Sequence, residues 1–421
     1  MKKVILLMAA CVAVGTAFVA CSSDDDLVQQ TPVVPEENVN EGTPFSVMPY
    51  SGTTRATLYN SDAWDGTNAT YVNCFKLYGA QGTAEPWVND VVFTRSSKSA
   101  AWVAERDADG AVASLKWPVD NPATTEVVES ATATDFYAIT DNAIKDQANN
   151  NALDYVSSWM NPVGSFTYTL PTEGVNIDWE DTSNPGALEP TNVTVVKNAG
   201  LKDLMVATAS HKESDPEVDN GALPLAFKHA LAGLTIEAKF LSHGEYDSNP
   251  LQNGWAKVKA VAICGLKTSG THAIGTGWNT LSTPVNYYYE LATPEKFDVQ
   301  DETDANKANP TTKTLVAAGN WLVIPQTTTP WDISFNSGQL PNPATCAYVI
   351  LKIEDFKNEG TDFFLCYPLN TTLHAGKNRT IVIDIAQGRD YSYNTNDPNK
   401  CDMYYDPATV FGGSREFEMD E

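Results

Sequence analysis

The residue types that carry most enzyme and metal chemistry are scattered along this chain. Its five histidines are His211, His229, His243, His272 and His374. They lie at least fourteen residues apart, so no local pair has metal-ligand spacing. The sequence has no GxSxG elbow, HExxH pair, GxxxxGK[ST] loop or glycine-rich dinucleotide loop. Carboxylates are abundant, but nothing in the sequence pairs two of them as in a glycosidase. We therefore predict no enzymatic activity, no metal site and no cofactor.

The seven cysteines indicate neither a zinc site nor a disulfide framework. Two of them, Cys11 and Cys21, belong to the N-terminal leader. The remaining five are an odd number without a CxxC spacing: Cys74, Cys264, Cys346, Cys366 and Cys401. We expect small buried thiols, with Cys346 and Cys366 as the pair if any disulfide forms.

The first residues predict export. Lys2 and Lys3 precede an uncharged, mostly apolar run over residues 4–20. That run is too short for a membrane span but typical of a secretory signal. It ends in "FVAC", which resembles the lipobox of bacterial lipoproteins, although Phe18 replaces the commoner leucine. The resemblance implies a lipid on Cys21 that anchors the protein to the outer membrane. The alternative is an ordinary cleaved signal with Cys21 incidental.

A short acidic run follows the leader. It comprises Ser23, Asp24, Asp25 and Asp26, and it resembles the export signal that sends some lipoproteins to the outside of the outer membrane. The alternative is a solvated acidic tail. Residues 22–42 are rich in Pro, Asn and Glu without periodicity, which predicts a flexible tether.

Composition favours strands and excludes one class of partner. The chain has 421 residues, enough for two domains. Aromatic residues make up 10% and charged residues 19%, with many Thr, Asn, Gly and Pro, which suits short strands and turns. The formal charge is −26. Nucleic acid is therefore excluded as an expected partner, because phosphate binding needs clustered Lys and Arg.

Alternating apolar and polar residues predict strands nearly throughout. In "TPFSVMPY", Phe45 and Val47 alternate with polar or exposed neighbours, and the polar loop "SGTTRAT" follows. A hairpin is expected at Asp109–Gly110, where a turn is favoured over a calcium loop. Only residues 143–159 hint at a short helix. The turn-rich segment "SHKESDPEVDNG" predicts a domain boundary near residues 205–222.

Residues 223–240, "LPLAFKHALAGLTIEAKF", are the most informative stretch. Phe227, His229 and Leu231 share one parity. The other parity is taken up after Gly233 by Leu234, Ile236, Ala238 and Phe240, while Thr235, Glu237 and Lys239 should face away. This change predicts a bulge or kink at Ala232–Gly233. A lone core-facing histidine is more often a hydrogen-bonded structural group than a ligand, and we interpret His229 in that way.

The segment "LAFKHALAGLTIEA" resembles the signature of the fimbrillin family of type V pilus proteins. Other pieces follow in the family's order, including "LKWP", "DFYAIT", "DLMVATA", "NWLVIPQT" and "LHAGKNRTIVIDI". The resemblance implies an all-β chain with two transthyretin-like β-sandwich domains, displayed at the cell surface and assembled into fimbriae. The implied partners are other fimbrial subunits, whether further copies or tip and anchor proteins, together with a maturation protease and an unidentified surface ligand.

These inferences divide the chain into five parts. Residues 1–20 are the signal peptide, and residues 21–55 are the tether with a removable first strand. Residues 56–210 and 211–388 are the two β-sandwich domains. Residues 389–421 form an acidic, Tyr-rich tail that departs from the family pattern, which leaves the C-terminal donor strand unassigned.

Arg55 lies in the polar loop where an arginine-specific protease could cut before Ala56. The cut would remove the lipid and the first strand, and it would open a groove for another subunit's strand. Refilling that groove with about five apolar side chains would contribute on the order of 10 kcal/mol before association costs. The alternative is that Arg55 is a surface charge.

A glycan-binding surface lipoprotein that does not polymerise is the rival function. It would present exposed aromatic rings for sugar stacking, with Trp255, Trp278 and the run Tyr287–Tyr289 as candidates. The alternative is that these rings fill strands and cores.

Overall fold

The structure is a computed structural model that describes most of the chain between residues 43 and 418. The described ranges are 43–51, 72–97, 99–106, 115–119, 130–140, 156–160, 164–175, 193–196, 203–241, 255–298, 311–331, 344–354, 362–385, 389–390 and 415–418. Within them the chain forms strands, turns and loops with no α-helix, which confirms the all-β prediction. None of these residues belongs to a helix long and apolar enough to cross a membrane. The Asp109–Gly110 hairpin lies outside the described residues.

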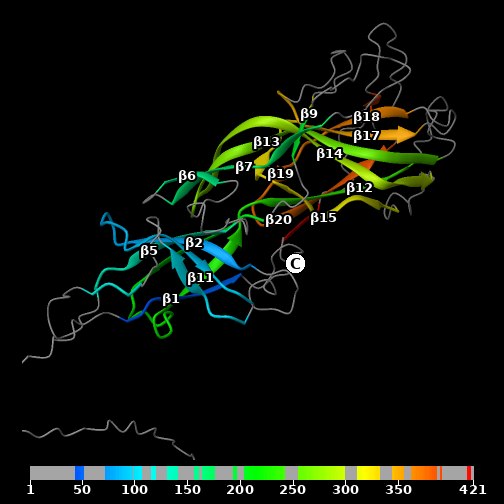
Figure 1. The fold of residues 1–421 in the computed structure, drawn as a ribbon. Helices are drawn as coiled ribbons and strands as arrows, with labels where there is room; N and C mark the ends of the chain where they lie inside the picture. Colours follow the sequence, from blue (N-terminus) through cyan, green and yellow to red (C-terminus); the bar gives the residue numbers. More distant parts are fainter. Residues whose placement is uncertain are drawn as a thin grey trace, which may run out of the picture.

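The strands gather into two groups, here called the first lobe and the second lobe (Figure 1). The first lobe is a seven-stranded arrangement in the order β1-β11-β10-β5-β2-β3-β4. Its strands are β1 (Ser46–Ser51), β2 (Cys74–Ala80), β3 (Val88–Thr94), β4 (Val103–Arg106), β5 (Thr134–Thr140), β10 (Met205–His211) and β11 (Ala222–His229).

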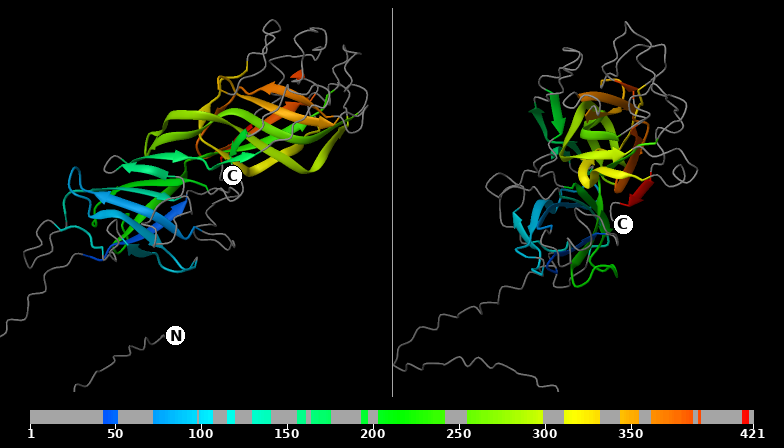
Figure 2. Two further views of the ribbon diagram at one scale, coloured as in Figure 1. Left: turned by 45° about the horizontal axis from the view of Figure 1, so that its top comes forward. Right: turned by 90° about the vertical axis from the view of Figure 1, so that its right-hand side faces the viewer.

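Strand β11 changes partner along its length, which folds the first lobe around its core. Residues 222–227 of β11 pair in parallel with β1, whereas only Lys228 and His229 pair with β10. The inward side chains of β1 and β11 share one apolar cluster with those of β2, β3 and β5. The strands consequently surround a common core, as the end-on view of the first lobe shows (Figure 2).

The second lobe contains a four-stranded sheet, β15-β12-β20-β22, and a nine-stranded sheet, which share one large core. The nine-stranded sheet runs β21-β18-β17-β13-β14-β9-β8, and β6 and β7 join it through β13. A two-stranded ladder joins β16 to β19. The strands are β6 (Val156–Met160), β7 (Ser165–Thr169), β8 (Thr172–Val175), β9 (Val193–Val196), β12 (Ala232–Lys239), β13 (Trp255–Ala273), β14 (Gly277–Asp298), β15 (Lys313–Val323), β16 (Gln326–Thr327), β17 (Tyr348–Glu354), β18 (Asp362–Pro368), β19 (Thr372–Leu373), β20 (Lys377–Asp384), β21 (Arg389–Asp390) and β22 (Arg415–Glu418).

The sheets do not change over at the predicted boundary after residue 210. The segment at 210–221 connects β10 to β11 inside the first lobe, because turn-rich polar residues also suit a strand connection. The changeover lies at Ala230 and Leu231, between β11 and β12. Strands β6 to β9 precede β10 in sequence and still join the second lobe. Residues 156–160 form strand β6, so the helix expected to reach residue 159 is wrong there.

The change of inward face predicted at Ala232–Gly233 is a change of sheet, and the register shifts of β12 against β15 come later, between Leu234 and Glu237. Residues 223, 225, 227 and 229 are buried, as predicted from their parity. The chain then leaves β11 and enters β12 in the other lobe, so the inward face is reset. Thr235 and Lys239 do not face solvent as expected, because the amide of Asn378 donates to Thr235 and Lys239 pairs with buried Asp384 at 3.9 Å.

The two lobes are joined by apolar packing at this changeover. Ile139 of β5 and Leu204, just before β10, belong to the core cluster of the second lobe. The indole Nε1 of Trp278 donates to the carbonyl of Ala230 at 2.6 Å, and the amide of Gly376 donates to the carbonyl of Leu231 at 2.8 Å. The lobes therefore share a packed joint.

Candidate functional site

Strand β1 lies at an edge of the first lobe, far in sequence from its only ladder partner among the described strands. Ser46 to Ser51 pair in register with Ala222 to Phe227 of β11, and the two strands run parallel. The alternation read from the sequence holds here: Phe45 and Val47 are each 8% exposed, whereas Met48 and Tyr50 are each 46% exposed. One face of the segment thus enters the core while the other faces outward.

Phe45 fills an aromatic pocket. Its ring lies 5.1 Å from that of Trp87 and 5.2 Å from that of Trp117, both edge-on, and 5.7 Å from the stacked ring of Phe136. Phe93 completes the pocket at 6.2 Å. Offset and edge-to-face rings at these separations attract one another beyond simple area burial. The pocket therefore favours an aromatic side chain at residue 45, immediately before β1.

Backbone hydrogen bonds hold the start of β1 on two sides. The amide of Phe45 donates to the carbonyl of Leu115, and the amide of Trp117 donates to the carbonyl of Thr43, each at 3.0 Å. On the other side, the amide of Ser46 donates to the carbonyl of Gly221 at 3.0 Å. Gly221 has a positive φ of 80°, and an added Cβ would lie 2.6 Å from the carbonyl oxygen of Pro44. A glycine is required at this close approach.

Strand β1 and the residue before it bury fewer apolar side chains than the sequence predicted. Among the described side chains of this segment, only two apolar ones, Phe45 and Val47, are buried, and not about five. Burying them contributes about 1.5–3 kcal/mol each, to which the backbone bonds add about 0.5–1.5 kcal/mol each. The docked strand is therefore held by modest, local interactions.

His229 is a buried, hydrogen-bonded residue, as predicted. It is 5% exposed, and its Nδ1 forms a hydrogen bond to Oδ2 of Asp203, which is fully buried. The neighbouring amide of Ala230 donates to the carbonyl of Leu204 at 2.8 Å. Asp203 and His229 thus join the end of β11 to the residues that lead into β10. No local pattern in the sequence identified Asp203 as the partner of His229.

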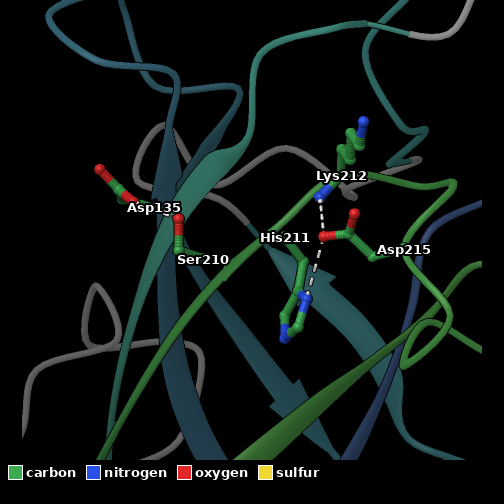
Figure 3. Close-up of polar contacts among 5 residues, drawn as sticks. All are labelled: Asp135, Ser210, His211, Lys212 and Asp215. Atoms are coloured by element: carbon green, nitrogen blue, oxygen red, sulfur yellow. Dashed lines mark hydrogen bonds and ion pairs between the residues drawn. The ribbon is translucent and has the colours of Figure 1, made fainter.

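The polar cluster at the far end of β10 is a turn and not a catalytic triad (Figure 3). Oδ2 of Asp215 accepts from the backbone amide of Lys212 at 3.1 Å and lies 3.2 Å from Nδ1 of His211. The hydrogen bond from Lys212 is the main cause that lowers the pKa of Asp215. Ser210 points away from His211 and donates to Asp135 at 2.7 Å. The serine is therefore not activated by the histidine.

The described cysteines are free thiols. Cys74, Cys264 and Cys366 are buried and Cys346 is half-buried, so the pair expected from Cys346 and Cys366 does not form. Burial raises the pKa of Cys264 to about 12, which leaves it an inert thiol. Within the described ranges, no group of three or more His, Cys, Asp or Glu residues could hold a metal ion.

Of the glycan-site candidates, Trp255 and Trp278 have described side chains, and both are half-buried. Trp278 packs against the core of the second lobe and donates to Ala230. Trp255 is half-buried, with the ammonium of Lys296 5.2 Å from its ring. Tyr287–Tyr289 lie on β14, and their side chains are outside the described part.

Two predicted features lie at or beyond the limits of the described chain. The predicted lipid, export and cleavage residues are outside it: Cys21, Ser23, Asp24, Asp25, Asp26, Arg55 and Ala56. From the tail at 389–421, Arg389–Asp390 form β21 at an edge of the nine-stranded sheet. Arg415–Glu418 form β22, which pairs antiparallel with Lys377–Thr380 of β20. The alternation of charged residues around Phe417 is the sequence signal that could have predicted this strand.

Comparisons with known proteins identify one family. A family model described as fimbrillin-like matches residues 175–398, which is more than half of the chain and includes His229, the joint and most of the second lobe. No curated protein matches the sequence.

Several solved structures resemble the chain at low identity. A candidate cell adhesion protein from Bacteroides uniformis is 12% identical, with 89% of this chain and 99% of that one covered and a TM-score of 0.36. One from Bacteroides eggerthii is 11% identical, with 90% and 96% covered and a TM-score of 0.37. One from Parabacteroides distasonis is 12% identical, with 82% and 88% covered and a TM-score of 0.37.

Proposed function

The chain belongs to the fimbrillin-like family, and from this premise we propose that it is a structural and adhesive subunit of cell-surface fimbriae. Its partners are other fimbrial subunits. It acts by assembly and adhesion and not as an enzyme, in keeping with its family.

The observation that carries the assembly proposal is the placement of β1. It is an edge strand with one buried face, and its last residue, Ser51, lies four residues before Arg55. A cut between Arg55 and Ala56 would leave β1 attached to its groove only by non-covalent contacts. Its departure would expose the edge of β11 and the pocket of Phe45, which is a template for a strand from a second copy.

The C-terminal segment is the donor that we propose for this groove. Phe417 and Met419 are separated by one residue, Glu418, just as Phe45 and Val47 are separated by Ser46. An aromatic residue followed two positions later by an aliphatic one is the pattern that the groove buries. Strand β22 ends the four-stranded sheet, where β20 is its only ladder partner among the described strands. It can therefore exchange without breaking a sheet interior.

Export and anchoring complete the proposal. A lipid on Cys21 and the run Ser23 to Asp26 would bring the precursor to the outer face of the outer membrane. A surface protease with arginine specificity would then free the maturing subunit from its lipid. We also propose that the chain forms two domains with transthyretin-like topology.

The test is the N-terminus of the protein on its native cell surface. We expect wild-type material to begin at Ala56, whereas Arg55→Ala and Arg55→Lys remain lipidated monomers. The lysine variant is the matched control, because it keeps the charge and removes only the arginine that the protease recognises. N-terminal sequencing that finds wild-type chains starting at Cys21 would overturn the cleavage step.

A further inference from the structure

Strand β11, which would accept the incoming strand, has most of its ladder partners in β1. Six residues of β11, Ala222 to Phe227, have their ladder partners in β1. Only Lys228 and His229 pair with β10, opposite Val206 and Met205. Once β1 leaves, most of β11 has no ladder partner among the described strands. Its inward side chains, Leu223, Leu225 and Phe227, would then be held mainly by what fastens the two ends of the strand.

The two ends of β11 are fastened in different ways. At its start, the indole of Trp117 donates to the carbonyl of Gly221 at 2.9 Å, but the segment of Trp117 is itself bonded to residues 43–45, which leave with β1. At its end, the carboxylate of Asp203 meets His229, and the amide of Ala230 donates to Leu204. Neither contact at this end involves β1.

We infer that the Asp203–His229 pair is a latch that keeps β11 docked while its edge is empty, so that the groove survives until a strand from a second copy enters. This inference rests on the proposed strand exchange. It makes His229 and Asp203 positioning residues, because they act on the incoming strand through β11 and do not touch it.

Burial and geometry support the latch over simple filling of the core. Asp203 is fully buried and its other oxygen, Oδ1, has no hydrogen-bond partner in the described structure, so His229 is the partner on which its carboxylate depends. A hydrogen bond to a charged group in such a site is stronger than a neutral one. The pair also adjoins Ala230 and Leu231, which are bonded to the second lobe through Trp278 and Gly376. The end of β11 is therefore tied to both lobes.

The experiment compares cut and uncut chains. A site for a sequence-specific protease replaces residues 53–58 of the full chain, and the N-terminal fragment carries a fluorophore. The test variant is Asp203→Ala/His229→Leu, which removes both polar partners and leaves no buried charge unpaired. The rescue variant is His229→Asn, whose amide can donate near the position of Nδ1. The matched control is Thr140→Val on β5, which removes a buried hydrogen bond to Cys74 and is separated from His229 by Met205 of β10.

Hydrogen exchange of the amides of residues 222, 223 and 225–227 measures the latch, because Pro224 has no amide hydrogen. In the cut chain, we expect the double variant to exchange about tenfold faster than wild type, with partial recovery in His229→Asn. In the uncut chain, we expect the difference to stay within about twofold, because tethered β1 re-forms its ladder. Equal acceleration in cut and uncut chains would overturn the latch. So would a cut Thr140→Val chain that matches the double variant, or an uncut double variant that does not fold.

Fragment exchange separates this inference from the proposed function. A synthetic peptide of residues 43–51 is added to the cut chains, and release of the labelled fragment is followed. We expect release from wild type and about tenfold faster release from the double variant. A wild-type fragment that never exchanges would count against strand exchange itself, while the hydrogen-exchange comparison on the same cut chains would still decide whether the latch holds β11.

Discussion

In each lobe, the strand next to the Ala230–Leu231 connection pairs in parallel with a strand that is distant in sequence. In the first lobe, β1 lies on β11 with six paired residues. In the second lobe, β20 lies on β12 with seven, from Gly233↔Asn378 to Lys239↔Asp384. The chain enters β12 three residues after it leaves β11. The two halves therefore place a parallel partner on each side of the same short connection.

The two pairs differ in how deeply the partner strand is built into its lobe. Strand β20 has β12 on one side and β22 on the other, and it buries Ile381, Val382 and Ile383. Among the described strands, β1 has only β11 in its ladder, and its segment buries Phe45 and Val47. A strand with neighbours on both sides is part of the scaffold, whereas an edge strand with one buried face can be replaced. The same pairing thus supports a fixed element in one lobe and an exchangeable one in the other.

The largest effect is expected from a substitution that weakens the exchangeable pair of β1 and β11. Phe45→Ala removes a ring that four aromatic side chains surround, and we expect it to weaken the docking of β1 by about 3–5 kcal/mol. Hydrogen exchange should then rise in β1 and β11 and not in β12 or β20. The matched variant Ile383→Ala should cost about 2–5 kcal/mol, with its effect in the second lobe. Equal loss of protection in both lobes from Phe45→Ala would show that β1 is no separate unit.

The second expected effect concerns the joint between the lobes and its pH dependence. His272 is 4% exposed, and burial lowers its pKa to about 4 from an ordinary value of 6.5. Its ring stacks on Phe166 at 5.1 Å and meets the edge of Trp278 at 5.0 Å. Because the folded chain holds the neutral ring, the unfolded chain takes up the proton first as the pH falls. Stability is full above about pH 6.5 and is lost progressively down to about pH 4.

The loss amounts to about 3 kcal/mol between these limits. Urea unfolding of the second lobe at several pH values measures it. His272→Phe should flatten the curve, while the docking of β1, which rests on apolar side chains and backbone bonds, should change little. If His272→Phe kept the pH dependence of wild type, groups other than His272 would be responsible for it.

The sequence predicted strands well because alternation is a local property. Phe45 and Val47, the parity of residues 223–229, and the burial of His229 could all be read from neighbours two positions apart. The partners of these residues could not. Asp203 is 26 residues from His229, and Trp117 is 104 residues from Gly221, and no local pattern marks either contact.

For the same reason, the turn-rich segment does not mark the place where the sheets change over. The segment at 210–221 and the connection at Ala230–Leu231 both interrupt strands, but the polar one stays within a lobe and the apolar one crosses between lobes. The crossing is apolar because Trp278 and the core of the second lobe cover it. Turn propensity shows where a strand ends and carries no information about which sheet the next strand joins.

A smaller expected effect compares the glycines at the starts of β11 and β12. At Gly221, which precedes β11, φ is +80° and an added Cβ would lie 2.6 Å from the backbone oxygen of Pro44. At Gly233 in β12, the nearest atom is the side-chain oxygen of Asn378 at 2.7 Å, which can move. We expect Gly221→Ala to cost about 1–3 kcal/mol, because backbone strain cannot relax without displacing β1. Gly233→Ala should cost less. Chemical denaturation that ranks them in the opposite order would contradict this account of the groove.

The smallest expected effect sharpens the comparison by testing the outer face of β1. Met48 and Tyr50 are each 46% exposed and lie opposite Pro224 and Ala226 of β11. Tyr50→Thr keeps a residue suited to a strand and removes a ring that is half in solvent, so we expect a change within about 0.5 kcal/mol. A peptide of residues 43–51 with this substitution should displace the labelled fragment of the cut chain as well as the unmodified peptide does. If the groove contacts only the buried face of the docked strand, the outward residues of a donor do not matter. Any donor with an aromatic and an aliphatic residue two positions apart can then enter. A large loss of displacement by the Tyr50→Thr peptide would instead mean that the outer face is also recognised, and the glutamates that alternate with Phe417 and Met419 would then count against the C-terminal segment as donor.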